Sequence, residues 1–166
     1  ADLAKASSAP TDNVVFGKFR LVRNGYEAKL GTSVFANSAT LHLYQQDGNE
    51  KFVGKVGSDG DFAWVLKPGS YRVSSIGFYT RGDKVEPVTN FTFTVPTDHD
   101  AIYVGTITLE TTVDSGVLGV NGTVDRYTVA NDCATVCAPR LEQLGLADTG
   151  ATVSLMQDHS HFARRN

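Results

Sequence analysis

Residues 58–73 read Ser-Asp-Gly-Asp-Phe-Ala-Trp-Val-Leu-Lys-Pro-Gly-Ser-Tyr-Arg-Val, and this stretch decides the fold class. Phe62, Trp64 and Leu66 are spaced two residues apart, which is the period of a strand with one buried face. The Lys-Pro-Gly-Ser segment at 67–70 predicts a turn, because proline fixes φ at the first turn position and glycine accepts the positive φ that follows. The tyrosine and the last valine of the stretch then resume the alternation. The stretch therefore predicts two strands joined by a tight turn.

Similar alternation recurs through the first two thirds of the chain. Each apolar segment is bounded by glycine, proline, aspartate or asparagine, at the spacing of about 8–12 residues that is typical of antiparallel sandwiches. The Asp-Gly-Asn turn at 47–49 predicts a hairpin. Parallel neighbours would need crossover helices, and none fits, so we expect a mainly β protein with an antiparallel seven-strand β-sandwich, immunoglobulin-like or prealbumin-like in size. The predicted strands are 14–22, 39–44, 51–56, 61–66, 71–76, 90–95 and 101–109, with a surface loop at 81–89.

An ordered set of turn and core residues runs through the same region. The set comprises Asp59, Gly60, Phe62, Leu66, Pro68, Gly69, Tyr71 and Val73. Together with the strand, turn and strand before it, this order resembles prealbumin-like sandwiches such as the carboxypeptidase regulatory-like and Cna-B-type repeats. The resemblance covers residues 39–76 most closely. It implies a β-sandwich, and modules of this kind serve as structural spacers, adhesion parts and sugar-binding units.

Composition restricts the class of protein. The chain has 166 residues, of which 15 are lysine or arginine and 18 are aspartate or glutamate, so its formal net charge is −3. This balance argues against a nucleic-acid-binding protein, which would carry an excess of basic residues. The hydrophobic share of 41% argues against a disordered chain. No apolar run approaches the roughly 20 residues that a membrane-spanning helix needs.

Residues 1–13 are small, polar and aperiodic, and we expect them to form a flexible tether. The chain starts with alanine, so we interpret it as the mature form of an exported protein, although a piece cut from a cytosolic protein would look the same. The family resemblance places the expected setting in the bacterial cell envelope, in the periplasm or at the outer membrane. There the tether would follow a lipid-modified cysteine, the anchor would be the contact with the membrane, and other envelope proteins would be the partners.

The sequence changes in character after the predicted sandwich domain at 14–110. Residues 111–156 predict an α/β extension docked on the sandwich. Its hairpin turn is expected at Asn121 and Gly122, although Gly119 leaves a longer loop open. The other predicted elements are a turn or short helix at 133–137, a helix at 139–145 that begins with a proline and ends at a glycine, a closing strand at 151–156 and a flexible tail at 157–166.

The two cysteines of the chain, Cys133 and Cys137, are four residues apart in this extension. In an exported protein we expect them to form a disulfide that closes a small loop; in a cytosolic protein they would be free thiols at helical spacing. A structural zinc site is not expected, because it needs four ligands and the nearest histidine is more than twenty residues away.

Near the C-terminus, Asp158, His159 and His161 form a candidate metal site. Two imidazoles spaced two residues apart on an extended segment face the same way and can bind Cu(II), Ni(II) or Zn(II). The competing interpretation is a solvated tail, because metal sites need neighbouring groups that orient the ligands. No cofactor is expected.

Tyrosines near turns are the candidate ligand or interface residues. Tyr26, Tyr44, Tyr79 and Tyr127 are expected to be partly exposed, and exposed aromatic rings suit sugar stacking or a protein interface. The usual nucleophile, phosphate-binding and metalloprotease motifs are absent from the sequence, so we expect no enzyme. The primary hypothesis is an envelope structural or protein-interaction module. The alternatives are a carbohydrate-binding module, with Trp64 or the tyrosines as stacking platforms, and a metal-binding periplasmic protein.

Overall fold

The computed structural model describes residues 13–28, 30, 39–46, 48, 50–80, 83–97, 101–116, 119–146 and 150–159. Within these residues lie twelve strands and one helix. The elements are β1 (Asn13–Arg23), β2 (Tyr26–Glu27), β3 (Ala39–Gln45), β4 (Lys51–Lys55), β5 (Asp61–Leu66), β6 (Gly69–Thr80), β7 (Asp83–Val85), β8 (Val88–Val95), β9 (Ala101–Gly116), β10 (Gly119–Ala130), α2 (Cys133–Gln143), β11 (Thr152–Val153) and β12 (Gln157–Asp158).

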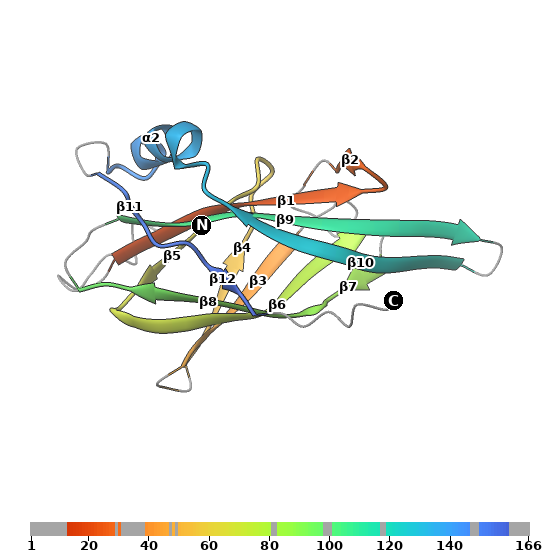
Figure 1. Ribbon diagram of the computed structural model, residues 1–166, viewed down its shortest axis with the longest axis horizontal. Helices are drawn as coiled ribbons and strands as arrows, with labels where there is room; N and C mark the ends of the chain where they lie inside the picture. The colour runs from red at the N-terminus through yellow and green to blue at the C-terminus, as the bar shows by residue number, and fades with distance from the viewer. Residues whose placement is uncertain are drawn as a thin grey trace.

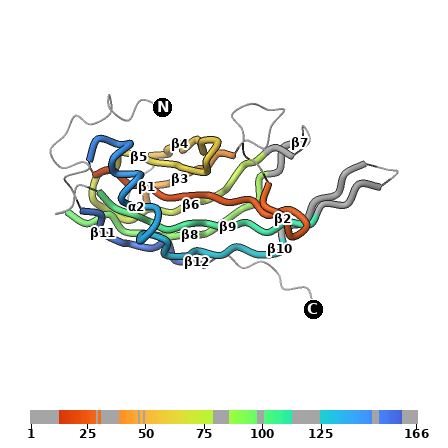
Figure 2. The backbone as a smooth tube through the Cα atoms, turned by 90° about the horizontal axis from the view of Figure 1, so that it is seen from above, coloured from red at the N-terminus to blue at the C-terminus, as the bar shows by residue number. Residues whose placement is uncertain are grey.

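The strands form two sheets, which lie as two layers in Figure 1 and are seen from above in Figure 2. The first sheet has the order β10-β9-β1-β2, with β5 also on β1 and β11 also on β9. The second sheet has the order β12-β8-β6-β3-β4, with β7 also on β6. A single core of buried side chains from both sheets fills the space between them. The prediction of a mainly β protein is therefore confirmed at the level of two packed sheets.

Two details of the predicted sheet architecture are wrong. In the predicted sandwich domain the described residues form nine strands, β1 to β9, where seven were predicted, partly because short pairing segments such as β2 and β7 carry no alternation of their own. The first sheet is also mixed, since β1 pairs with β9 in parallel, from Val14 opposite Ala101 to Arg23 opposite Thr111. The chain between these two strands builds the whole second sheet except β12, so it returns to the first sheet without needing a crossover helix.

The stretch 58–73 joins the two layers. β5 pairs with β1 in the first sheet, whereas β6 pairs with β3 and β8 in the second. Trp64 on β5 is 5% exposed, and its indole stacks at 6.4 Å on Phe93 of the opposite sheet. An ideal Cβ on Gly54 would lie 2.7 Å from this indole, so β4 passes close to the tryptophan only because position 54 has no side chain.

The hairpin of the C-terminal region is longer than predicted, and its turn lies elsewhere. β9 and β10 pair from Gly116 opposite Gly119 back to Thr106 opposite Ala130. Asn121 and its neighbouring glycine lie inside β10, so the predicted turn at this dipeptide is wrong and the alternative at Gly119 is nearer to the structure. The apolar alternation of β9 sets the register here, because its inward residues must face the core.

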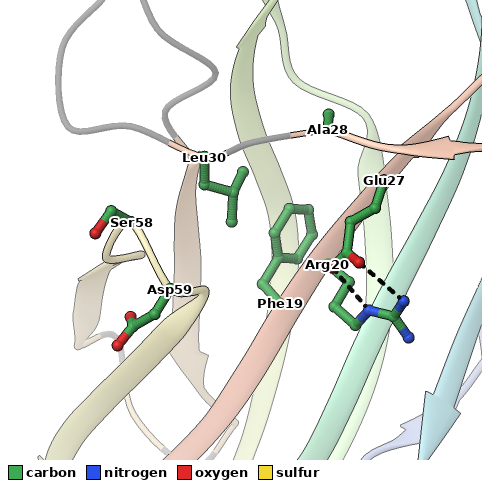
Figure 3. A pocket seen from close by; sticks show the side chains of 7 residues that line it. All are labelled: Phe19, Arg20, Glu27, Ala28, Leu30, Ser58 and Asp59. Carbon is green, nitrogen blue, oxygen red and sulfur yellow. Dashed lines mark hydrogen bonds and ion pairs between the residues drawn. The ribbon is translucent and has the colours of Figure 1, made fainter.

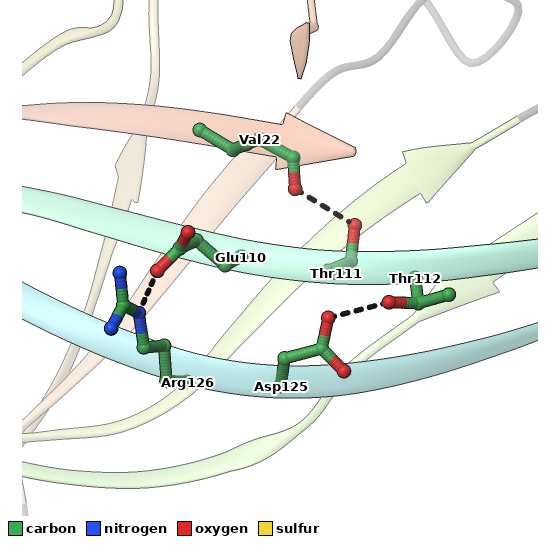
Figure 4. A network of polar contacts seen from close by, with 6 residues as sticks. All are labelled: Val22, Glu110, Thr111, Thr112, Asp125 and Arg126. Atoms are coloured by element: carbon green, nitrogen blue, oxygen red, sulfur yellow. Dashed lines mark hydrogen bonds and ion pairs between the residues drawn. The ribbon is translucent and has the colours of Figure 1, made fainter. Parts of the chain in front are cut away.

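Polar contacts hold the two strands together on the surface of this hairpin (Figure 4). The Arg126 guanidinium pairs with the Glu110 carboxylate, and the Thr112 hydroxyl donates to the Asp125 carboxylate at 2.6 Å. Asp125 lies at a shift of register between its two neighbours, where a β-bulge interrupts the ladder. The predicted boundary at 110 and 111 lies inside β9, so the extension continues the first sheet directly.

Helix α2 begins earlier than the predicted helix at 139–145 and includes the 133–137 segment. Cys137 and Leu141 are buried one turn apart against Phe16 and Tyr103 on the outer side of the first sheet, and this shared contact holds both segments as one helix. Figure 1 shows the helix on the outside of that layer. Gly145 ends the helix as predicted, with φ of 74° and its N–H donating to the Glu142 carbonyl.

The end of the described chain closes the open side of the two sheets. Of the predicted closing strand at 151–156, only Thr152 and Val153 form a strand, β11, which pairs with β9 in the first sheet. The chain then crosses to the second sheet, where Gln157 and Asp158 form β12 against β8. These residues belong to the predicted tail, and residues 160–166 lie outside the described part. The predicted loop at 81–89 likewise contains a strand, β7, which pairs with β6.

Candidate functional site

The outer face of the second sheet carries a continuous row of polar and aromatic side chains. The register places Lys51 opposite Tyr44, Tyr44 opposite Arg72, Arg72 opposite Thr92, and Thr92 opposite Gln157. Directly opposed residues of antiparallel strands point to the same face. Because the neighbours of these residues in β3, β6 and β8 are buried in the core, this face is the outward one. The row crosses five strands, or about 19 Å at the usual strand spacing.

Arg72 and Tyr44 form the centre of the row. The guanidinium carbon of Arg72 lies 5.8 Å from the centre of the Tyr44 ring, within the range of a cation–π contact. Both side chains are half-buried. The Nε atom of Arg72 is buried and has no hydrogen-bond partner in the described part of the chain. The ring therefore packs against the half-buried guanidinium on the outward face of the sheet.

Two shorter rows lie beside the first. Val53 is 58% exposed and opposite His42, whose Nε2 lies 3.0 Å from the Glu86 carboxylate. Lys55 stands opposite Thr40 in the next row. The outward face of β3 and β4 thus carries two exposed lysines on either side of an exposed valine.

A shallow depression of about 280 Å³ adjoins the central row on the β6, β8 and β12 side. Its rim offers hydroxyl and amide groups, which can both donate and accept hydrogen bonds. The Ser154 hydroxyl already donates to the Thr94 carbonyl at 3.0 Å, which fixes this wall of the depression. The lining residues are Gln46, Ser70, Thr92, Phe93, Thr94, Ser154, Leu155 and Gln157.

A second depression, of about 340 Å³, lies beside β1 and β2 on the first sheet (Figure 3). Arg20 and Glu27 point toward one another there, with guanidinium nitrogens 3.0 and 3.3 Å from the two carboxylate oxygens. This pairing raises the pKa of Arg20 and lowers that of Glu27. Because the Nε and Nη2 atoms of Arg20 already donate to Glu27, we interpret this pair as a surface contact that holds β2 against β1.

A pair of carboxylates lies under helix α2. Burial, followed by a hydrogen bond with Asp59, raises the pKa of Asp61 to about 6. Burial acts to raise the pKa of Asp59 as well, but its hydrogen bonds to the Asp61 side chain and backbone outweigh this and lower it. Arg140 of the helix lies 4.0 Å from the Asp61 carboxylate. The pair can therefore share a proton at mildly acidic pH, close to the contact between helix and sheet.

The predicted tyrosines separate into three groups. Tyr26 on β2 is 80% exposed, as expected, and Tyr44 lies in the row described above. The expectation for Tyr127 is wrong, because it is 8% exposed and packs edge-on against Phe91 at 5.2 Å, inside the core. The side chain of Tyr79 lies outside the described part. Trp64 is buried between the sheets and cannot serve as a stacking platform.

The predicted metal ligands are described only in part. Asp158 and His159 are exposed at the end of β12, and His161 lies outside the described residues. Within the described part, no group of three potential ligands gathers around one point. Burial and the nearby Asp158 carboxylate together raise the pKa of the Tyr127 phenol. Asp158 stands opposite Phe91 on β8, the residue against which the Tyr127 ring packs.

The two predicted disulfide residues are at bonding distance, with Cys133 Sγ and Cys137 Sγ 1.99 Å apart. Both lie in the first turns of α2, and the buried cysteine packs on the first sheet. The bridge therefore links the start of the helix to the residue that anchors it.

Sequence reasoning missed Arg72 and Lys51. The alternation of the predicted strands already placed both residues on the outward face, but many solvated polar residues occupy the same kind of position. Only the pairing of five strands shows that these two side chains share a row.

The described part of the chain contains no helix that is long and apolar enough to span a membrane. No family model matches the sequence, and no curated protein matches it. Among solved structures, the chain is similar to a DUF3823 family protein from Parabacteroides merdae, with 22% identity and a TM-score of 0.34. The match covers 75% of this chain, and the chain spans 62% of that structure. A likeness this distant leaves the fold to be described by its own sheet topology.

Proposed function

We propose that this chain is a non-enzymatic binding module of the bacterial cell envelope, which holds a partner against the outer face of its second sheet. The observation that carries the proposal is the row Lys51–Tyr44–Arg72–Thr92–Gln157, which crosses five strands on one face. A row of this length suits an extended partner and not a small molecule, which would need a deeper pocket.

The residue types of the row support recognition. Arginine and tyrosine are enriched among the residues that carry most of the binding energy at interfaces, and here they stand together at the centre. The stacked ring limits the conformations of the guanidinium, so less entropy is lost when a partner binds. The exposed Lys51 extends this contact toward the sheet edge.

Several features fit an exported protein. The cysteine pair at bonding distance in α2 is typical of oxidising compartments. Residues 1–13 have the composition of a tether, and such a tether after a lipid anchor would leave the binding face free. We also interpret the two packed sheets as a prealbumin-like β-sandwich, on the strength of the sequence motif at 58–73.

Co-sedimentation with an isolated bacterial envelope fraction tests the proposal. We compare the wild-type chain with Lys51→Glu, and with Arg126→Glu as a control that makes the same change of net charge on the first sheet. Arg126 is 71% exposed, so its replacement leaves the core intact. We expect retention of the wild type and the control and loss of the Lys51 variant. Equal retention of all three proteins would mean that the row is not the binding face.

A further inference from the structure

We propose that the partner of this face is an acidic polysaccharide, whose carboxylates are bound by Arg72 and Lys51 and whose hydroxyls are bound in the adjoining depression. This inference rests on the proposed function and names its ligand class. It differs from the sugar-stacking hypothesis based on Trp64, because that indole is buried and the row uses charge in its place.

The first step is charge. The chain as a whole has a net charge of −3, yet the outward positions of β3, β4 and β6 carry Lys51, Lys55 and Arg72. Among the described acidic residues beside these rows, Glu86 pairs with His42, Asp158 stands opposite the buried Phe91 and outside the row, and Glu50 is exposed next to Lys51. The outward face is therefore locally basic on an acidic protein, and a negatively charged ligand is complementary to it.

The second step is the geometry of Arg72. A guanidinium is a planar fork that binds a carboxylate through two parallel hydrogen bonds, whereas a lysine acts as a point charge. The Tyr44 ring lies 5.8 Å from the guanidinium carbon and restricts where this fork can lie. The site is therefore suited to reading a carboxylate at a defined place and not to attracting negative charge in general.

The third step is the chemistry beside the basic residues. Thr92 and Gln157 continue the row, and with Ser70 and Thr94 they line the depression of about 280 Å³. Hydroxyl and amide side chains match the hydroxyls of a sugar, which donate and accept at closely spaced positions. An acidic peptide would use the basic residues equally well but would leave this hydroxyl-rich surface without matching groups, so the observations favour the polysaccharide.

Affinity gel electrophoresis with defined polymers tests the inference. Polygalacturonate supplies a carboxylate on every sugar, and its fully methyl-esterified form has the same backbone without the charge. Poly-L-glutamate supplies the same carboxylates on a peptide. We expect binding to polygalacturonate, with the esterified polymer and poly-L-glutamate at least tenfold weaker, because the first lacks the charge and the second lacks the hydroxyls.

Variants then assign the contacts. Arg72→Lys keeps the charge but loses the fork, and we expect about tenfold weaker binding, the usual effect of a lost charge-assisted hydrogen bond. Tyr44→Phe keeps the ring and should bind as the wild type does, while Tyr44→Ala should weaken binding. Arg126→Lys makes the same substitution as Arg72→Lys at an exposed arginine of the first sheet, so it is the matched control and should bind normally. The tryptophan fluorescence of each variant reports whether its core is intact.

Three outcomes overturn the inference. Equal binding of poly-L-glutamate would make the ligand an acidic peptide. Equal affinity of the Arg72→Lys and wild-type chains, with binding abolished by moderate salt, would reduce the contact to general electrostatics. Absence of polygalacturonate binding while the envelope fraction still retains the protein would refute the ligand class but leave the proposed function standing, so the two failures are distinguishable.

Discussion

Replacing Tyr103 with phenylalanine removes one oxygen atom from the junction of the first sheet with helix α2. The side chain is fully buried, and its hydroxyl lies 2.7 Å from the Thr106 hydroxyl. It also accepts a hydrogen bond of 3.1 Å from the backbone N–H of Asp132, the residue just before α2. A longer contact of 3.5 Å joins the same hydroxyl to the Ala130 carbonyl. The variant therefore loses two short hydrogen bonds and one long one without disturbing the packing of the ring.

The cost follows from these contacts. Each hydrogen bond contributes about 1 kcal/mol net, so losing the two short ones should lower the free energy of unfolding by about 2 kcal/mol. For a chain of this length that corresponds to a decrease in Tm of roughly 4–8 °C. Urea unfolding followed by the fluorescence of the single tryptophan measures the change.

The control is Tyr26→Phe, because that side chain is 80% exposed and its variant should differ from the wild type by less than about 0.5 kcal/mol. Thr106→Val should lose part of the same energy, and the double variant with Tyr103→Phe should cost less than the sum of the two single changes. A Tyr103→Phe variant as stable as the Tyr26 control would refute the view that this hydroxyl fastens the helix to the sheet.

Three further predictions concern packing, pH and the disulfide. Gly54→Ala should destabilise the fold by about 1–3 kcal/mol, because its Cβ would lie 2.7 Å from the buried Trp64 indole; an unchanged midpoint in urea would mean that the indole moves freely. The pKa of Asp61 is raised to about 6 in the folded chain, above its unfolded value of 3.8. This group therefore stabilises the fold most below about pH 4, where it is protonated, and the contribution is lost as the pH rises through 6. Asp61→Asn should flatten stability curves across this window, and a slope equal to that of the wild type would argue against the shift. Replacing Cys133 and Cys137 by serine should cost about 2 kcal/mol by loop-closure entropy, and thermal unfolding with and without reductant should show that the reductant no longer affects the variant.

Local patterns predicted most of the strands. Six of the seven predicted segments lie wholly within β-strands, the 51–56 segment extends one residue past β4, and the 61–66 segment matches β5 at both ends. Period-two alternation is a property of neighbouring residues, so it can be recognised without knowing the partner strand. The start of the helix was harder to predict, because Pro139 suggests that a helix begins there. In the structure, the burial of Cys137 and Leu141 on the first sheet keeps the chain helical on both sides of the proline.

Pairing between distant strands could not be predicted in the same way. The parallel contact of β1 with β9 joins residues separated by most of the second sheet, and no local pattern records it. The Asn-Gly dipeptide within 119–130 favours a turn when considered alone, but the core-facing residues of β9 require another register. The burial of Tyr127 follows from the same register, because its position opposite Leu109 turns its ring into the core.

The sequence by itself determined that the chain is mainly β, that Phe62, Trp64 and Leu66 share one face of a strand, and that two cysteines lie close enough to pair. These are consequences of spacing along the chain. Only the tertiary structure decided that Lys51, Tyr44 and Arg72, from three different strands, form one outward row. The physical reason is that hydrogen-bonded register between strands depends on contacts across the whole sheet, so a surface assembled from several strands exists only once they have paired.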